Sequence, residues 1–390
     1  YSKKSVFIMR KNVKIIEKIC KNTEFFKEKC MKKYEYIKNL INIKSFDLFE
    51  NENIINYLID KFSIFSKEII KIKNEKNDKY NLLIGLNTEL KNVPDAIVLA
   101  GHIDTVVADE NAYATDPYCA TEIEGKIYGL GAIDMKSYFA CILNNIEMLK
   151  SCGRPIVVAI TSDEETDLEG VELVTRKMQE LNICPFVTII GEPTNNCICS
   201  QSKSCNEYSI EITGKSCHSS MNSQGINANY IACRIMLYIE TLNNVFADTT
   251  MSANIMSGGE KINIVPAYAK VMFDLRSASS ANENKLMRML ADFIATLKTQ
   301  YAGCEITLEN QLRIPPLEKR DDELIAQICK SLDTKEQDFV GACEAGYYQS
   351  VGGSAIVFGV GDLALAHKPN EFVSLDEFDD YEAKFMQLID

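Results

Sequence analysis

The stretch AIVLAGHIDTV, residues Ala96–Val106, joins an apolar run of strand length to a short segment that contains His102 and Asp104. The chain has only three histidines in 390 residues, so a histidine directly after such a run needs an explanation. Open parallel sheets bind their ligands just outside the carboxyl ends of the strands. The stretch therefore predicts a buried strand whose end presents His102 to a ligand site.

Three other apolar runs of strand length end beside side chains that can bind metals. Ile156–Ile160 precedes Glu164 and Glu165, Val187–Ile190 precedes Glu192, and Ala355–Gly359 precedes the loop with His367. Segments with helical spacing of apolar residues alternate with these runs, which is typical of a parallel α/β sheet. We therefore expect a mostly parallel sheet, flanked by helices, with all of these side chains at one edge.

A helix is expected between the first two of these strands. Its apolar positions recur at helical spacing and are Phe139, Ile142, Leu143, Ile146 and Leu149. Gly153 marks its end. Asp134 then lies at or just before the start of the helix, in a loop.

The segment from Glu207 to Asn310 has a different pattern. Its elements read as strand, helix, strand, strand, helix, strand, which is typical of a small ferredoxin-like α+β domain. The parallel-sheet pattern resumes afterwards, so this domain is expected to be an insertion that makes the catalytic domain discontinuous. The predicted division is a basic N-terminal extension at 1–33, a catalytic domain at 34–206 and 312–390, and the inserted domain at 207–311.

Charge and composition restrict the partners. The net charge of −13 disfavours nucleic acid and anionic lipid and favours small solutes or metal cations. Residues 1–33 carry +8, which is typical of a solvated Lys-rich helix or a disordered extension. No apolar run approaches the roughly 20 residues of a membrane span. The fourteen cysteines lack the spacing of a disulfide framework, so we expect a cytoplasmic protein that binds neither membrane nor nucleic acid.

Five side chains near the strand ends are of the types that bind metals: His102, Asp134, Glu165, Glu192 and His367. Zinc binds imidazole nitrogens and carboxylate oxygens, and a catalytic zinc keeps one position open. The set is one ligand short of two separate three-ligand sites, so a metal pair requires a bridging carboxylate. Asp134 is the natural bridge.

Two acidic residues beside these ligands have other predicted roles. A histidine ligand needs an acceptor on its second ring nitrogen, and the H-x-D spacing puts the Asp104 carboxylate on the same side of an extended chain as His102. Two adjacent carboxylates repel each other, which is unfavourable unless they have different roles. Glu165 is therefore assigned as a metal ligand and Glu164 as the general base.

Each candidate also has an ordinary structural interpretation. The alternatives are a helix cap for Asp134, a turn acceptor for Asp104, a solvated acidic face for Glu164 and Glu165, a strand end for Glu192, an exposed turn for His218 and a surface strand for Arg276. Glu344, in CEAGYY, either meets a cationic substrate tail or caps the local backbone.

Six segments, in the order GHIDTV, GAIDMKS, TSDEET, GEPT, GKSCHSS and AHKPNEF, carry a resemblance. From about Met31 to the end, the chain resembles the di-zinc metallopeptidase and deacylase family, which includes acetylornithine deacetylase, succinyl-diaminopimelate desuccinylase, aminoacylases and carboxypeptidase G. The segments CEAGYYQ and AHKPNEF look most like those of the acetylornithine deacetylases. Leu130 and Ser137 depart from the family pattern, which usually has Arg and Gly there.

The resemblance implies a ligand assignment. One zinc is held by His102 and Glu192, the other by Glu165 and His367, and Asp134 bridges them. It thus implies two Zn²⁺ per chain, with Co²⁺ as a possible replacement, and Glu164 as the base.

The resemblance also gives the inserted domain a role as a lid through which the chain forms a homodimer. His218 then reaches the active site of the partner and stabilises the oxyanion. Arg276 and Asn263 fall where members of the family contact the substrate carboxylate or anchor the lid.

The expected function is removal of the acyl group from an N-acyl amino acid, with N-acetylornithine, in arginine biosynthesis, as the leading substrate. Desuccinylation of N-succinyl-diaminopimelate and dipeptidase or aminoacylase reactions are alternatives on the same scaffold. An inactive zinc-binding, dimeric interaction protein is the alternative outside enzymes.

Overall fold

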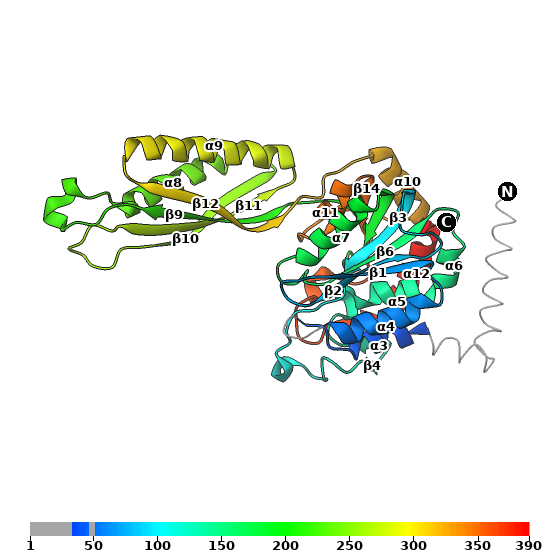
Figure 1. Ribbon diagram of the computed structural model, residues 1–390. Coiled ribbons are helices and arrows are strands. Elements are labelled where there is room, and N and C mark those ends of the chain that lie inside the picture. The colour runs from blue at the N-terminus through cyan, green and yellow to red at the C-terminus, as the bar shows by residue number, and fades with distance from the viewer. Residues whose placement is uncertain (1–32, 47–50, 390) are drawn as a thin grey trace, which may run out of the picture.

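The computed structural model describes residues 33–46 and 51–389. The chain forms a body built on a large sheet and an arm, residues 205–314, built on a separate antiparallel sheet that extends away from the body (Figure 1). Apart from Lys33, the predicted basic extension lies outside the described residues. In the part of the chain that is described, no helix is both long and apolar enough to cross a membrane.

The sheet of the body has eight strands in the order β1-β2-β6-β3-β7-β14-β8-β13. Their bounds are Glu68–Lys73 (β1), Tyr80–Gly85 (β2), Val93–His102 (β3), Ile156–Thr161 (β6), Ile183–Ile190 (β7), Ile198–Ser202 (β8), Glu336–Phe339 (β13) and Ser354–Val357 (β14). The four strands predicted from the sequence are its centre, because β6, β3, β7 and β14 pair in parallel. The predicted mostly parallel α/β sheet is confirmed.

Helices cover both faces of this sheet because alternate side chains of each strand point to opposite faces. Ile97 and Leu99 of β3 face one apolar core, while Val98 and Ala100 face the other. The first core is closed by α3 (Glu35–Ile41), α4 (Glu52–Ser63), α5 (Ser137–Asn144), α6 (Ile146–Lys150), α10 (Asp322–Leu332) and α12 (Leu375–Ile389). The second is closed by α7 (Glu169–Glu180) and α11 (Ala345–Val351).

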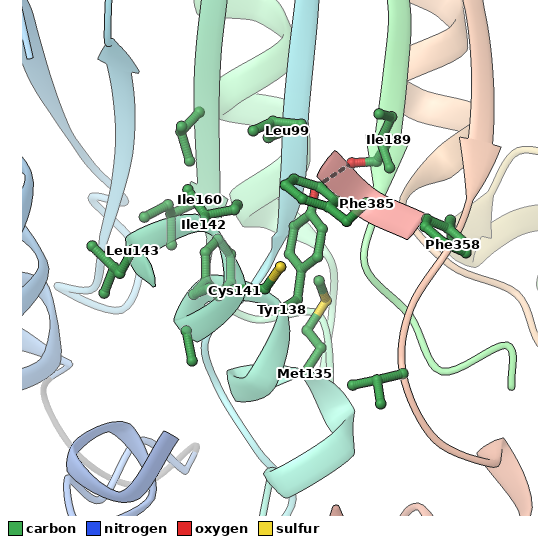
Figure 2. Close-up of a cluster of buried hydrophobic side chains, with 14 of the residues drawn as sticks. Leu99, Met135, Tyr138, Cys141, Ile142, Leu143, Ile160, Ile189, Phe358 and Phe385 are labelled. Carbon is green, nitrogen blue, oxygen red and sulfur yellow. Dashed lines mark hydrogen bonds between the residues drawn. The ribbon is translucent and has the colours of Figure 1, made fainter. Parts of the chain in front are cut away.

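Helix α5 is fixed firmly to the sheet. Tyr138 crosses the core and its hydroxyl donates a hydrogen bond of 2.8 Å to the carbonyl of Ile189 in β7, while Phe385 of α12 packs beside its ring (Figure 2). The predicted single helix is instead two, which meet at Asn145, where the backbone leaves the helical conformation with φ −111° and ψ 14°. The Asn145 side chain donates a hydrogen bond to the carbonyl of Cys141 there. The anchored α5 follows Asp134 closely, so it limits where that residue can lie.

The arm has the predicted strand and helix order. Its elements are β9 (Cys205–Thr213), α8 (Ala228–Leu242), β10 (Thr249–Gly258), β11 (Tyr268–Ser277), α9 (Ser280–Gln300) and β12 (Glu305–Ile314). The strands pair in the order β10-β11-β9-β12, and both helices lie on one face of the sheet (Figure 1). The inserted α+β domain is therefore confirmed as a fold. The predicted boundaries at 206/207 and 311/312 fall inside β9 and β12, so the exact division into domains stays a prediction.

A small third sheet joins two loops that border the strand ends. It consists of β4 (Thr121–Ile123), β5 (Lys126–Tyr128) and β15 (Phe372–Ser374). Phe372 pairs with Tyr128, and the Gly129 amide donates to the carbonyl of Glu371. This sheet holds the loop that leads to Asp134 against the loop that follows His367.

Candidate metal centre and active site

The parallel strands end together and carry the predicted residues to one edge of the sheet. His102 is the last residue of β3 and pairs with Thr161, the last residue of β6. Ile190 at the end of β7 pairs with Val357 of β14. The loops that follow these ends bring together all five predicted ligands, His102, Asp134, Glu165, Glu192 and His367.

The two histidines lie on opposite sides of Asp134. His102 Nε2 is 3.0 Å from Asp134 Oδ1 and 3.5 Å from Glu192 Oε1. His367 Nε2 is 3.3 Å from the other oxygen, Asp134 Oδ2, and 2.9 Å from Glu165 Oε1. Each imidazole is therefore near one oxygen of Asp134 and one further carboxylate, which is the arrangement that a bridging carboxylate requires.

Donor atoms in this cluster are close enough to share a cation. His102, Asp134 and Glu165 each offer a ligand atom within 4.8 Å of the others, and so do His102, Glu164 and Glu192. The mixture of imidazole and carboxylate donors suits zinc and other first-row divalent metals. His102 belongs to both groups, so cations at the two positions would be neighbours.

The second nitrogen of His102 is held differently from the prediction. Its Nδ1 is 3.0 Å from the backbone carbonyl oxygen of Asp104, whereas the nearer carboxylate oxygen, Oδ1, is 3.5 Å away. The other carboxylate oxygen, Oδ2, accepts a hydrogen bond of 3.1 Å from the Glu165 amide. Asp104 thus orients His102 mainly through its backbone, and its side chain ties the β3 loop to the acidic turn after β6.

Buried carboxylates dominate the electrostatics of the cluster. Burial raises the pKa of Glu164 and of Glu192 well above the ordinary value, and neighbouring carboxylates raise both further. Burial opposes ionisation of Asp134 as well, but hydrogen bonds to His102 and His367 keep its pKa below the ordinary value. An excess of negative charge in a buried place needs a compensating cation, and divalent metals would supply it.

The same carboxylates shift the pKa values of the two histidines. Burial lowers the pKa of His102, but hydrogen bonds to Asp104 and Asp134 more than offset it and leave the pKa well above the ordinary value. Hydrogen bonds to Asp134 and Glu165 raise the pKa of His367 to about 10. Protons on these imidazoles supply the positive charge in a metal-free cluster, so metal binding would displace them.

Glu164 stands beside the ligands without a partner of its own. Among the described residues, its carboxylate has no hydrogen bond or ion pair, although it lies within the group formed with His102 and Glu192. An acid with a raised pKa and an uncommitted carboxylate is suited to accept and return a proton.

Glu371 was missed by the sequence reasoning. This buried side chain accepts hydrogen bonds from the amides of Gly131 at 3.0 Å, Ile133 at 2.8 Å and Asp134 at 3.3 Å. It therefore shapes the turn that presents Asp134. The only signal was its place in AHKPNEF, four residues after His367, and its contact with residues far back in the chain is invisible to local patterns.

The predicted residues of the arm are not brought to the cluster. His218 belongs to the connection between β9 and α8, and Asn263 to that between β10 and β11. Both connections lie at the end of the arm away from the body (Figure 1). His218 is exposed, with Nδ1 2.8 Å from the hydroxyl of Ser220. Arg276 is bound through Nε to both carboxylate oxygens of Asp274, at 3.1 and 2.9 Å. The roles of His218, Asn263 and Arg276 stay predictions.

Glu344 lies in the body at the start of α11, with a side chain that is completely buried. Burial raises its pKa to about 7. A side chain with no exposed surface cannot meet the tail of a substrate in this conformation, so the geometry does not support that predicted role.

Both departures from the family pattern are accommodated by packing. Leu130 is buried in a small apolar cluster with Phe46 and Tyr118, where an arginine would place a charge. Ser137 is buried at the start of α5, and its hydroxyl donates a hydrogen bond to the carbonyl of Ala132. Neither residue is among the five candidate ligands.

A sequence model of peptidase family M20/M25/M40 matches residues 98–390. The acetylornithine deacetylase of Photorhabdus laumondii is 31% identical over 87% of this chain and 90% of its own length. That of Proteus mirabilis is 31% identical over 83% of this chain and 86% of its own length. This chain belongs to peptidase family M20/M25/M40. The resemblance inferred from the six sequence segments is thereby confirmed.

Solved structures show the same fold as this M20/M25/M40 member. Aminopeptidase PepT from Bacillus cereus superposes with a TM-score of 0.74 at 20% identity, over 92% of this chain and 97% of that one. The Bacillus subtilis YXEP protein, described as a dinuclear metal binding peptidase, gives a TM-score of 0.64 at 14% identity, over 92% and 97%. Family membership and the cluster together identify a metal-dependent hydrolase that acts on amide bonds.

Proposed function

We propose that this protein removes the acyl group from N-acyl amino acids, with N-acetylornithine as the main substrate and ornithine and acetate as products. The observation that carries the proposal is the similarity to acetylornithine deacetylases over most of both chains. The cluster at the strand ends supplies chemistry suited to the reaction. The activity would serve arginine biosynthesis in the cytoplasm.

The donor set fits two divalent metals, for which we propose zinc, with cobalt as a replacement. His102 and Glu192 would hold one ion, Glu165 and His367 would hold the other, and Asp134 would bridge them. When bound, the metal pair would polarise the amide carbonyl and lower the pKa of the attacking water.

Glu164 is the proposed general base. Its carboxylate would take a proton from the water as the oxygen attacks the amide carbon, and it would return that proton to the amine nitrogen as the C–N bond breaks. Burial among other carboxylates raises the pKa of Glu164, which makes the carboxylate a stronger base. After it has taken the proton, the carboxylic acid can deliver that proton to the leaving amine. Asp104 would hold the ring of His102 and the Glu165 amide in place throughout.

We further propose a homodimer that pairs through the arm. Support comes from exposed large apolar side chains on β10, on the connection that follows it and at the start of β11: Ile255, Met256, Ile262, Ile264 and Tyr268. In the dimer His218 of one copy would donate a hydrogen bond to the oxyanion at the site of the other. Asn263 and Arg276 would contact the substrate carboxylate or anchor the arm.

Turnover of several substrates by zinc-loaded protein tests the proposal. N-acetylornithine should have a higher kcat/KM than N-succinyl-diaminopimelate, a dipeptide or other N-acyl amino acids. A preference for one of those would reassign the chain within its family. No turnover of any of them by protein with a full metal complement would favour an inactive zinc-binding interaction protein.

A further inference from the structure

A second buried charge cluster lies directly behind the acidic turn that carries Glu164 and Glu165. The preceding residue, Asp163, has a side chain with 0% exposure, and Lys79 Nζ lies 2.6 Å from its Oδ1. The Lys79 side chain is itself only 5% exposed. A buried ion pair of this kind persists only where its geometry and hydrogen bonds are good, since removing both charges from water is unfavourable.

The other carboxylate oxygen of Asp163 is also occupied. Its Oδ2 accepts hydrogen bonds from the side-chain amides of Asn77 at 2.9 Å and Asn74 at 3.4 Å. Asn74, Asn77 and Lys79 all belong to the turn between β1 and β2, residues 74–79, which we call the hairpin turn. Three side chains of one turn thus converge on one carboxylate that lies 84 to 89 residues away in sequence.

The hairpin turn is held in shape by its own hydrogen bonds. The Asn74 amide donates to the carbonyl of Lys79 at 2.8 Å, and the Asn77 side chain accepts from the Lys79 amide at 3.1 Å. Strand β2 follows at once and pairs with β6, whose end leads into the acidic turn. The turn is therefore a rigid support joined to the sheet.

Asp163 in turn organises the acidic turn. Its backbone carbonyl accepts hydrogen bonds from the amides of Leu168 at 2.7 Å and Asp167 at 3.2 Å. Its φ of +71° lies in the left-handed region, which aspartate adopts more readily than most residues but which still needs surrounding contacts to hold it. Asp163 thus helps to set the direction in which Glu164 and Glu165 leave the sheet, together with the Asp104 carboxylate that holds the Glu165 amide.

We propose that Lys79 is a positioning residue, which acts through Asp163 to fix the places of Glu164 and Glu165. This inference rests on the proposed function, because it assumes that Glu164 is the base and Glu165 a metal ligand. Lys79 itself touches neither substrate nor metal. The groups around an active site that orient its ligands typically change activity or metal affinity by about 10- to 100-fold when they are removed.

The test compares Lys79→Met with Lys76→Met in the full chain. Lys76 is a matched control because it lies on the same turn and pairs with Glu169, but its side chain is 77% exposed. In Lys79→Met, kcat for N-acetylornithine should fall by about 10- to 100-fold with KM within about twofold. Zinc affinity, measured by competition with a chelator, should fall by about tenfold. Lys76→Met should stay within about twofold of the parent in all three quantities.

A double variant, Lys79→Met with Asp163→Asn, covers the case in which Lys79→Met fails to fold. It removes both charges of the Lys79–Asp163 pair, so it should fold, but it should keep the loss of kcat and of zinc affinity. Lys79→Arg should recover part of both. A folded double variant with parental kcat and zinc affinity would overturn the proposal, and so would an altered KM with unchanged kcat. If the parent hydrolyses no N-acyl amino acid, the proposed function fails, while zinc affinity still tests the positioning role.

Discussion

The strand ends of the body and the outer end of the arm each present a histidine, in opposite settings. His102 has a side chain that is 1% exposed, and both ring nitrogens have partners within its own chain. The ring of His218 is exposed, and among the described residues its Nδ1 contacts Ser220 alone. The partners of the first histidine all come from the fold of one chain, whereas the ring of the second is open to solvent.

The sheet of the body is also covered more completely by helices than the sheet of the arm. Helices cover both faces of the sheet in the body, but both helices of the arm lie on one face of its sheet. An antiparallel sheet can leave one face or one edge open to a neighbour, and β10 is such an edge strand. The candidate metal centre therefore lies in a sheet covered on both faces, whereas the arm leaves one face of its sheet without helices.

The largest expected effect comes from Glu164→Gln in the body. Its amide cannot take up a proton, so kcat should fall by about 10²- to 10⁴-fold while zinc content stays at the parental level. Metal analysis and steady-state kinetics measure the two quantities. Glu305→Gln, on an exposed position of the arm, is the control and should be unchanged. Near-parental activity of Glu164→Gln would place the base elsewhere.

His218→Ala tests whether the arm completes the site of another copy. It should lower kcat by about 10²- to 10³-fold without loss of metal, because an oxyanion donor stabilises the transition state alone. Mixing it with Glu164→Gln under subunit exchange should restore activity, since one site of the heterodimer then has both residues. Asn222→Ala on the same connection is the control. Absence of rescue despite proven exchange would remove the proposed role across the dimer.

Metal removal should affect the body and spare the arm. Loaded protein should contain about two zinc or cobalt ions per chain. Dialysis against a chelator should lower the free energy of unfolding by roughly 5 kcal/mol, about 2.7 kcal/mol for each of the two ions, relative to protein in metal at about 100 times its Kd. Hydrogen exchange should then quicken at the ends of β3 and β6 but not in β9–β12. Equal changes in hydrogen exchange in both regions would mean that metal binding stabilises the arm as much as the body.

The smallest expected effect is that of Glu371→Gln, which should lower the free energy of unfolding. Its side-chain amide would face a backbone N–H, so metal-free protein should lose about 1–3 kcal/mol at pH 5. Burial raises the pKa of Glu371 to about 8, so the folded state binds its proton more tightly than the unfolded state does. That stabilisation is complete below the ordinary pKa and is lost as pH rises through about 8.

Urea titrations of metal-free parent and Glu371→Gln at several pH values check this sign. The difference in unfolding free energy should shrink between pH 5 and 8, because only the parent loses the contribution of the buried acid. Glu377→Gln, an exposed position on α12, provides the control. A difference that stays constant from pH 5 to 8 would mean that Glu371 is ionised throughout and would contradict a raised pKa.

Much of this protein was predictable from its sequence by local pattern. Apolar spacing predicted the runs that became β3, β6, β7 and β14 and the order of elements in the arm. Four candidate ligands follow from what stands after each run, and Asp134 follows from its place before the helix that became α5. The interruption at Asn145 was not predictable in this way, because the apolar pattern continues on both sides of it, at Ile142 and Ile146.

The sequence by itself determined which side chains lie at the strand ends, because a parallel sheet aligns the ends of its strands. Only the tertiary structure decided which oxygen of Asp134 faces which histidine, that the Asp104 backbone rather than its carboxylate lies nearest His102, and that Glu371 holds the loop of Asp134. The physical reason is distance along the chain. Glu371 and Ile133 are 238 residues apart and Lys79 and Asp163 are 84 apart, so no local periodicity records their contacts.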